Sequence, residues 1–178
     1  HAIHLRDGKK LGDAKLIDTM IKDGLWDAFH GYHMGVTAEN VATKFQVTRD
    51  DQDKFALNSQ EKALKAQKEN KFKKEILNFK IVSKKNELNF DKDEHPREGI
   101  NLDTLKRLKP VFKKDGTVTA GNASGINDGA AAVAMMSSQE AEKKGIEKLV
   151  TIKSWASCGV DPALMGTGPI PASKKALE

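Results

Sequence analysis

The sequence predicts an α/β fold, and two observations favour this class. Segments whose apolar residues recur at helical spacing alternate along the chain with short runs that are rich in β-branched side chains. The composition is that of a globular chain of 178 residues, with 38% hydrophobic residues and 14 glycines. This length suits one domain, or one domain with part of a second.

The first half of the chain is predicted to be mainly helical. Apolar residues at helical spacing predict a short helix over residues 13–23, and Thr37 can cap a second helix. Residues 48–51 resemble a capping box, in which two side chains satisfy free backbone N–H groups at a helix start. They should open a longer helix that reaches about Asn70, because its apolar residues fall on one face.

A hairpin is expected after this helix. Residues 75–82 and 87–90 are β-prone runs separated by polar residues, which is the pattern of two paired strands. A short helix is expected over residues 103–108, because Pro110 follows it closely and would end it.

The C-terminal part is predicted to continue as strand, helix and strand. Residues 130–136 favour a buried strand over a helix, because Ser137 can then open a short helix that ends at Gly145. Residues 149–156 alternate and are β-branched enough for another strand. From Pro171 onward the chain has the pattern of a helix without a stop signal, and it opens on a residue other than Met. We therefore expect a fragment of a longer protein.

Common catalytic and metal-binding motifs are missing from the sequence. It has no phosphate-binding glycine loop, dinucleotide-binding motif, zinc-protease motif or serine-hydrolase motif. The acidic residues at 91–95 lack the other positions of a calcium loop, which favours a solvated loop. The single cysteine, Cys158, excludes a disulfide framework, and a small core residue is favoured there over a nucleophile. No apolar run approaches the roughly 18 residues of a membrane span, so we expect a soluble, cytoplasmic protein.

Three features point to a ligand with phosphate groups and a long apolar part. Lysines and arginines cluster over residues 97–114 and could hold phosphate oxygens, with solvated surface as the alternative. Large apolar side chains over residues 25–34 could line a groove or pack in a core. Small residues over 119–125 allow close backbone approach to a ligand, although a tight turn has the same pattern. A nucleic-acid binder is a less favoured explanation of the net charge of +5, because only 6% of residues are aromatic.

Several collinear stretches of the chain resemble the thiolase family. Among its branches, they are similar to the biosynthetic acetoacetyl-CoA thiolases, which are the acetyl-CoA acetyltransferases. The stretches are residues 18–25, 32–41, 117–124, 127–131 and 165–172. They extend over nearly the whole chain, which makes the resemblance far more specific than any one short motif.

The resemblance implies a partial thiolase fold. Thiolases have two similar α/β halves, and a long α+β loop domain inserted in the first half holds coenzyme A. Residues 1–125 would be this loop domain, 126–147 the end of the N-terminal half, and 148–178 the start of the C-terminal half.

The resemblance also implies a set of residues that bind coenzyme A. In the family, apolar side chains line a tunnel for pantetheine, cations lie by the nucleotide, and a hydroxyl binds a pantetheine amide. The matching residues are Leu25, His33 and Met34 along the tunnel, Arg97 and Thr104 by the nucleotide, Val111, Phe112 and Ala120 packed on the ligand, and Ser124 on the amide.

As activity, the resemblance implies the condensation of two acetyl-CoA to acetoacetyl-CoA and CoA, or the reverse cleavage, through an acetyl-cysteine. The family's nucleophilic Cys, its His and its acid/base Cys match no residue here, Cys158 included, so this chain alone should be inactive. Coenzyme A would be a substrate, no prosthetic group or metal is implied, and the complete enzyme would be a homotetramer without nucleic-acid or membrane partners. Two alternatives stay open: a longer-chain 3-ketoacyl-CoA thiolase, and a non-catalytic CoA-binding module.

Overall fold

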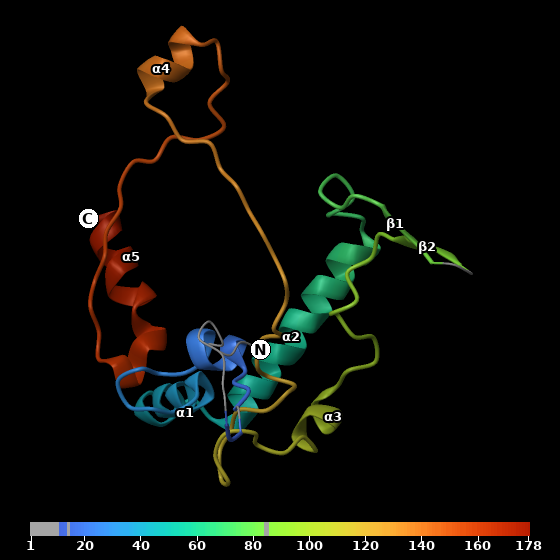
Figure 1. The fold of residues 1–178 in the computed structure, drawn as a ribbon, viewed down its shortest axis with the longest axis vertical. Coiled ribbons are helices and arrows are strands. Elements are labelled where there is room, and N and C mark those ends of the chain that lie inside the picture. The colour runs from blue at the N-terminus through green and yellow to red at the C-terminus, as the bar shows by residue number, and fades with distance from the viewer. Residues whose placement is uncertain (1–10, 14, 84–85) are drawn as a thin grey trace. The chain divides into compact units, whose positions relative to one another are not determined.

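The computed structural model describes residues 11–13, 15–83 and 86–178. It divides into two compact units, each considered by itself. The first unit contains the described residues up to Val41 together with Ile126–Glu178, and the second is Ala42–Gly125. Both helices and strands are present along the chain (Figure 1).

The second unit is built on the long helix α2, Arg49–Lys68. Thr48 begins it through a complete capping box, since its hydroxyl accepts the N–H of Asp51 while the Asp51 carboxylate accepts the N–H of Thr48. Asn70 has a positive φ of 54°, a left-handed conformation that ends the helical path. The long helix predicted from residue 48 to about 70 is therefore confirmed.

The predicted hairpin is also present, although its first strand begins at Phe79 and not at residue 75. Strands β1, Phe79–Val82, and β2, Glu87–Phe90, pair antiparallel with Phe79 opposite Phe90. Their residues are all exposed, so among the described residues this hairpin has little side-chain packing beyond its own cross-strand pairs (Figure 1).

Helix α3, Leu102–Lys106, confirms the short helix expected at 103–108 and packs against α2. Asn101 caps its start: the Asn101 side chain accepts the N–H of Thr104, and the Thr104 hydroxyl accepts the N–H of Asn101. Leu105 of this helix is 1% exposed and is the largest fully buried side chain of the described residues. The apolar centre of the second unit therefore lies between α2 and α3.

The first unit contains the remaining short helices. Helix α1, Met34–Lys44, starts in this unit, and its last three residues belong to the second. Ser137 caps α4, Ser138–Lys143, and Gly145 follows with a φ of 65°, so the helix predicted from Ser137 to Gly145 is confirmed. The other helices are the π-helical turn η1, Met20–Gly24, the 3-10 segment η2, Pro162–Thr167, and α5, Pro169–Leu177.

Two helices predicted near the N-terminus begin at other residues than expected. In place of a helix over residues 13–23, the described residues of this segment form only the helical turn η1, Met20–Gly24, because the Asp18 carboxylate accepts the N–H groups of Met20 and Ile21 and starts the turn there. Thr37 does not cap α1, which begins a turn earlier at Met34, and Thr37 is buried inside the helix.

The two strands predicted at 130–136 and 149–156 are also wrong. Neither segment has regular secondary structure, and Val133 is 82% and Leu149 92% exposed. A strand needs a neighbour to accept and donate its backbone hydrogen bonds, and the described residues offer these segments none. None of the described helices is long and apolar enough to cross a membrane.

Candidate functional site

The first group of predicted site residues meets at a tight turn that leads into α1. The N–H of Met34 donates to the carbonyl of Leu25 at 2.8 Å, and Trp26 and His33 form an antiparallel bridge. Gly31 has a φ of 71° within this turn, which favours glycine. Leu25, His33 and Met34 are therefore brought side by side, each half-buried.

A buried carboxylate holds this turn together. Asp27 Oδ2 accepts the backbone N–H of His30 at 2.6 Å and lies 2.9 Å from Nδ1 of the His30 ring. Burial raises the pKa of Asp27, but hydrogen bonds from His30 and Phe29 outweigh it, so the pKa lies below its ordinary value of 3.8. The His30 ring stacks on Tyr32 with centroids 5.4 Å apart.

Two further contacts fix the orientation of the residues around His33. The N–H of Gly35 donates to Nδ1 of His33 at 3.0 Å, so the neutral ring carries its proton on Nε2. Asn40 donates from Nδ2 to the hydroxyl of Tyr32 and to the carbonyl of Ala163, each at 3.2 Å. Asn40 thus ties α1 both to the preceding turn and to η2.

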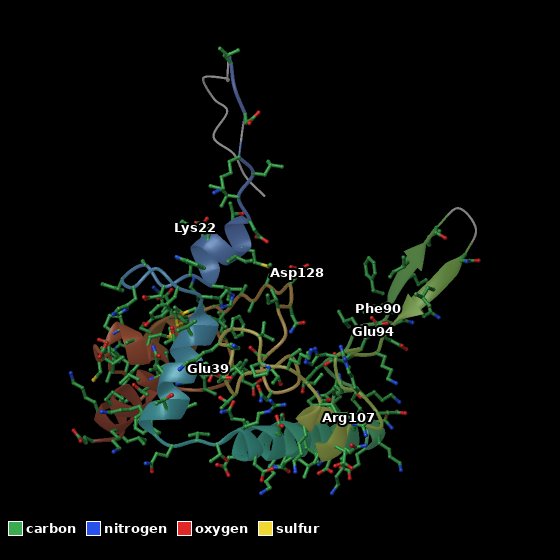
Figure 2. The ribbon with its side chains drawn as sticks, turned by 90° about the horizontal axis from the view of Figure 1, so that it is seen from below. Lys22, Glu39, Phe90, Glu94, Arg107 and Asp128 are labelled. Atoms are coloured by element: carbon green, nitrogen blue, oxygen red, sulfur yellow. The ribbon has the colours of Figure 1, made fainter. Side chains whose placement is uncertain are left out.

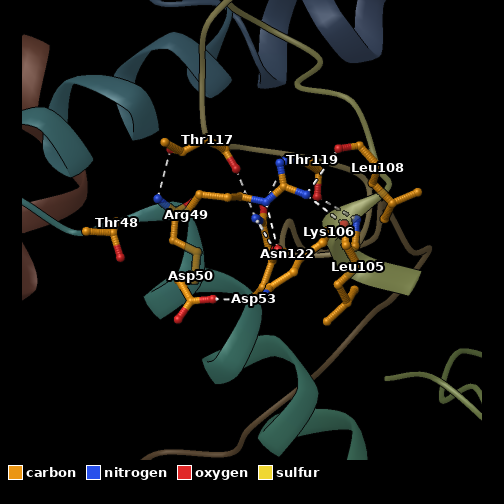
Figure 3. Close-up of polar contacts among 12 residues, drawn as sticks. Thr48, Arg49, Asp50, Asp53, Leu105, Lys106, Leu108, Thr117, Thr119 and Asn122 are labelled. Carbon is orange, nitrogen blue, oxygen red and sulfur yellow. Dashed lines mark hydrogen bonds and ion pairs between the residues drawn. The ribbon is translucent and has the colours of Figure 1, made fainter. Parts of the chain in front are cut away.

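The second group of predicted site residues lies around a buried polar cluster of Arg49, Asp53 and Asn122, here called the clamp (Figure 3). Asp53 is completely buried. Its Oδ2 accepts Nε of Arg49 at 2.8 Å, and its Oδ1 accepts Nδ2 of Asn122 at 3.0 Å. One carboxylate therefore joins α2 to the loop that contains Asn122.

The side chains of Arg49 and Asn122 also form hydrogen bonds with backbone groups. The Arg49 guanidinium donates to the carbonyls of Leu105 and Leu108, at 2.6 and 3.1 Å, where α3 ends. Asn122 donates to the carbonyl of Thr117 at 3.0 Å, and its Oδ1 accepts the N–H of Thr119 at 2.8 Å. The buried charge of Asp53 is thus paired and hydrogen-bonded, as a buried carboxylate must be.

Ala120 and Ser124 are exposed on the turn that the clamp holds. The carbonyl of Thr119 accepts the N–H groups of Asn122 and Ala123, which closes the turn between these two predicted site residues. Just upstream, the N–H of Val111 donates to the carbonyl of Val118 at 3.1 Å. The predicted site residues Val111 and Phe112 therefore lie on a segment paired with the same loop, Val111 exposed and Phe112 half-buried.

Arg97 and Thr104, the two residues predicted to lie near the nucleotide of coenzyme A, differ in the contacts of their side chains. The Arg97 backbone N–H donates to Oε1 of Gln60, while its exposed guanidinium has no ion-pair partner in the described part of the chain. The Thr104 hydroxyl donates to the carbonyl of Asn101 at 2.7 Å and belongs to the α3 cap. Figure 2 shows Arg107, a further cation, at the end of α3.

Neighbouring charges of α2 are paired at the surface. Hydrogen bonding and charge attraction from Lys54 lower the pKa of Asp50, and Asp50 raises the pKa of Lys54 in return. The hydroxyl and N–H of Thr48 lower the pKa of Asp51. Lys106 also lies 3.6 Å from Asp50, so one cation of the basic 97–114 segment is partly neutralised.

A separate cavity of about 690 Å³ lies at the C-terminal end of α2, and none of the predicted site residues lines it. Its walls mix apolar side chains, such as Phe72, with lysines and carboxylates, such as Lys68 and Asp91. Within the described residues, no group of three or more His, Cys, Asp or Glu is placed to hold a metal ion. Cys158 is a free thiol and is exposed, so the core position expected for it is wrong.

The sequence did not single out the clamp. The one available signal was the opposite charge of Arg49 and Asp53 at a spacing of four, which on most helices marks a solvated pair. Asn122 lay within a run of small residues that any tight turn could have. Their importance depends on burial, which the chain reveals only when it is folded.

Comparison with known sequences shows to which family the chain belongs. Residues 1–139 match the family described as "Thiolase, N-terminal domain". Acetyl-CoA acetyltransferases of Rhizobium meliloti and Shinella zoogloeoides are 61% and 60% identical to the chain, over 100% of it and 45% of their own length. The cytosolic acetyl-CoA acetyltransferase of Rattus norvegicus is 51% identical over 99% of the chain and 45% of its length.

Solved structures of the same family also match the structure of this chain. Acetyl-CoA acetyltransferase of Bacillus anthracis matches with a TM-score of 0.84 and 44% identity, over 97% of this chain and 43% of that one. Human mitochondrial 3-ketoacyl-CoA thiolase matches with a TM-score of 0.86 and 41% identity, over 99% of this chain and 45% of that one. The chain thus spans a little under half the length of the relatives it matches.

Proposed function

Since the chain belongs to the thiolase family, we propose that the protein containing it is an acetyl-CoA C-acetyltransferase. It condenses two acetyl-CoA to acetoacetyl-CoA and free CoA, and it cleaves acetoacetyl-CoA in the reverse direction. The observation that carries the proposal is that relatives with 51 to 61% identity across this chain bear the name acetyl-CoA acetyltransferase. The substrates are CoA thioesters, and the reaction needs no prosthetic group.

The proposed reaction proceeds through an acetyl-cysteine. A cysteine thiolate attacks the carbonyl of acetyl-CoA, and CoA leaves as the thiol after taking a proton. The acid/base Cys takes a proton from Cα of a second acetyl-CoA. The resulting carbanion attacks the acetyl group, which forms the new carbon–carbon bond and releases the nucleophilic cysteine as its thiolate. We assign no residue of this chain to these steps and place the nucleophilic Cys, the His and the acid/base Cys outside it.

The part assigned to this chain is the binding of coenzyme A, which positions the thioester for reaction. In the first unit, Leu25 and Met34 supply an apolar wall for pantetheine, and they lie together because their backbones are hydrogen-bonded at 2.8 Å. The Nδ1 atom of His33 accepts the N–H of Gly35, so Nε2 is the ring nitrogen that can act as a donor.

In the second unit, we assign the nucleotide end of coenzyme A to the exposed guanidinium of Arg97, a planar donor suited to phosphate oxygens. We assign Thr104 of the α3 cap to the same end of the ligand, and its contact with the ligand would have to share the hydroxyl with Asn101. Ser124 is exposed and available to hydrogen-bond the pantetheine amide. The remaining contacts are apolar and come from Val111, Phe112 and Ala120.

A longer-chain 3-ketoacyl-CoA thiolase is the second candidate, because the human enzyme of that kind matches this chain with a TM-score of 0.86. The pair His33-Met34 favours the acetoacetyl-CoA branch, since it is typical of that branch. The acyl chain length therefore separates the two candidates.

The test is a thiolysis assay on the complete polypeptide that contains this sequence. The loss of 3-ketoacyl-CoA is followed with free CoA as the second substrate, using acetoacetyl-CoA and 3-ketooctanoyl-CoA. The proposal expects kcat/KM to be at least about tenfold higher for acetoacetyl-CoA, a difference of about 1.4 kcal/mol in transition-state stabilisation. Higher kcat/KM for the longer substrate would support the second candidate.

Binding of CoA without turnover of either substrate would instead support the non-catalytic module. An acyl-enzyme trapped with radiolabelled acetyl-CoA and released by free CoA would exclude that module directly. For the complete enzyme we further propose a cytoplasmic homotetramer, which light scattering coupled to size-exclusion chromatography can test.

A further inference from the structure

The loop that contains Ser124, residues 120–125, has few internal contacts that could fix its conformation. Residues 120–125 are small except for Asn122. All of them are exposed except Gly121 and Asn122, which are half-buried. Its backbone hydrogen bonds are short-range and all run to Thr119, whose carbonyl accepts the N–H groups of Asn122 and Ala123 and whose hydroxyl accepts the N–H of Gly121. The position of this loop must therefore be set by contacts with other elements.

Asn122 makes those contacts with both ends of its side-chain amide. Its Nδ2 donates to the buried Asp53 and to the carbonyl of Thr117, and its Oδ1 accepts the N–H of Thr119. The amide thus joins the backbone on one side of the turn to α2 on the other, two positions before Ser124. Figure 3 shows Asn122, Asp53 and Arg49 converging from these elements.

Gly121 lets this loop come close enough for the clamp to close. A Cβ atom at Gly121 would lie 2.5 Å from Cδ2 of Leu105 and 2.6 Å from Cδ1 of Leu108. The backbone therefore rests directly on the two leucines at the end of α3, whose carbonyls are bound by Arg49. Apolar contact and the polar clamp act on the same few residues.

We infer that Asn122, held by Asp53 and Arg49, is a positioning residue that sets where Ser124 and Ala120 meet the pantetheine arm of coenzyme A. This inference rests on the proposed function. Asn122 does not touch the ligand; it fixes the turn that does. Its removal should weaken CoA binding while the chemical step, performed by residues outside this loop, keeps its rate.

The experiment compares four forms of the complete polypeptide: wild type, Asn122→Asp, the double variant Asn122→Asp/Asp53→Asn, and Thr48→Ala. In Asn122→Asp, two carboxylates face each other where an amide and a carboxylate lay 3.0 Å apart. The KM for acetoacetyl-CoA and the Kd for CoA from calorimetry should rise about tenfold, with kcat within about twofold of wild type.

The double variant tests the clamp itself. An amide at position 53 can donate to the carboxylate at position 122 and accept from Nε of Arg49, so the repulsion between the two carboxylates disappears. The hydrogen bond to the Thr117 carbonyl stays lost, so the recovery should be partial. We expect KM to return at least halfway, on a logarithmic scale, to the wild-type value. A general loss of stability would not be repaired by a second substitution in the buried core. If Asn122→Asp does not fold, Asn122→Ala takes its place, with Asp53→Asn as an independent weakening of the clamp.

Thr48→Ala is the stability control. It removes the α2 cap in the same unit without altering the clamp, and its KM should stay within about twofold of wild type. An unchanged KM in Asn122→Asp, or an equal rise in Thr48→Ala, overturns the inference and leaves the proposed function intact. A wild-type protein that neither binds CoA nor cleaves acetoacetyl-CoA overturns both.

Discussion

Arg49 and Asp53 lie one turn apart on α2, and their side chains meet at 2.8 Å with the carboxylate completely buried. The same guanidinium reaches the end of α3, and the same carboxylate reaches Asn122. An ion pair of this spacing on an exposed helix face contributes little. Here it is the point at which three separate segments of the second unit are joined.

Removing the buried carboxylate should therefore destabilise the protein. Asp53→Ala leaves Arg49 and Asn122 without their shared acceptor, and we expect unfolding free energy to fall by about 3 kcal/mol. Urea unfolding followed by circular dichroism measures this loss. Asp50→Ala, which removes an exposed carboxylate of the same helix, is the matched control and should have a much smaller effect. Equal losses in the two variants would show that burial of the clamp adds nothing.

Leu105 should be the most sensitive apolar position of the second unit. It is 1% exposed, so Leu105→Ala leaves a cavity between α2 and α3 and should cost about 2–4 kcal/mol. Leu77→Ala makes the same chemical change at a side chain that is 86% exposed, and it should cost less than about 0.5 kcal/mol. Thermal unfolding of both variants gives the comparison.

Gly121→Ala should lower the stability of the protein, because there is little space for the added methyl group. The added methyl group would overlap Leu105 and Leu108 at the end of α3, and the expected cost is about 1–3 kcal/mol. Gly129→Ala is the control, because a Cβ there meets no atom within 4 Å. Adding Leu108→Ala to Gly121→Ala removes one of the two contacts and should recover part of the loss. No recovery would mean that the contact with Leu108 is not the source of the loss.

Lowering the pH should reduce the stabilisation that the capping box gives to the start of α2. The pKa of Asp51 lies below its ordinary value of 3.8, because Thr48 donates hydrogen bonds to the ionised carboxylate. Since the folded state binds this proton more weakly than the unfolded state, the stabilisation is present above about pH 4 and is lost as the pH falls through the lowered pKa. Asp50 and Asp27 shift in the same direction and add to the effect.

The measurement is the denaturation midpoint between pH 7 and pH 2. Asp51→Asn should show a shallower fall on the acid side than wild type, because one of the shifted carboxylates is gone. A curve of unchanged steepness in Asp51→Asn would contradict the assignment of the effect to the capping box.

The start of α1 should depend on the Nδ1 atom of His33. His33→Ala removes the acceptor for the N–H of Gly35, and a lost helix cap typically costs about 1 kcal/mol. His33→Asn places an amide oxygen near the position of Nδ1 and should retain most of the stability. Hydrogen exchange at the Gly35 amide reports this contact directly, and it should speed up in the alanine variant alone.

Local patterns were enough for the elements that are stabilised locally. The capping box at 48–51 and the one-sided apolar pattern predicted α2, and the two β-prone runs predicted the hairpin, whose ladder is complete within itself. The resemblance to the thiolase family and the α/β fold class are also confirmed, since the solved structures that match are thiolases. The chain corresponds to part of that fold.

Patterns failed where an element depends on a distant partner or on a single side chain. The strands predicted at 130–136 and 149–156 have no neighbouring strand among the described residues. The start of α1 was misplaced by a turn, because the His33 ring caps it and histidine is not a usual capping residue. The binding roles of the predicted site residues stay predictions, which the proposed experiments test.

By itself, the sequence determined the long helix, the hairpin and the family, because these depend on local spacing or on residues read in order. Only the tertiary structure decided that Asp53 is buried, that Asn122 reaches it across 69 residues of chain, and that Gly121 rests on Leu105. The physical reason is that the effect of a charge or an amide depends on its surroundings. In water Arg49, Asp53 and Asn122 would contribute little, and only their burial together makes them hold a loop in place.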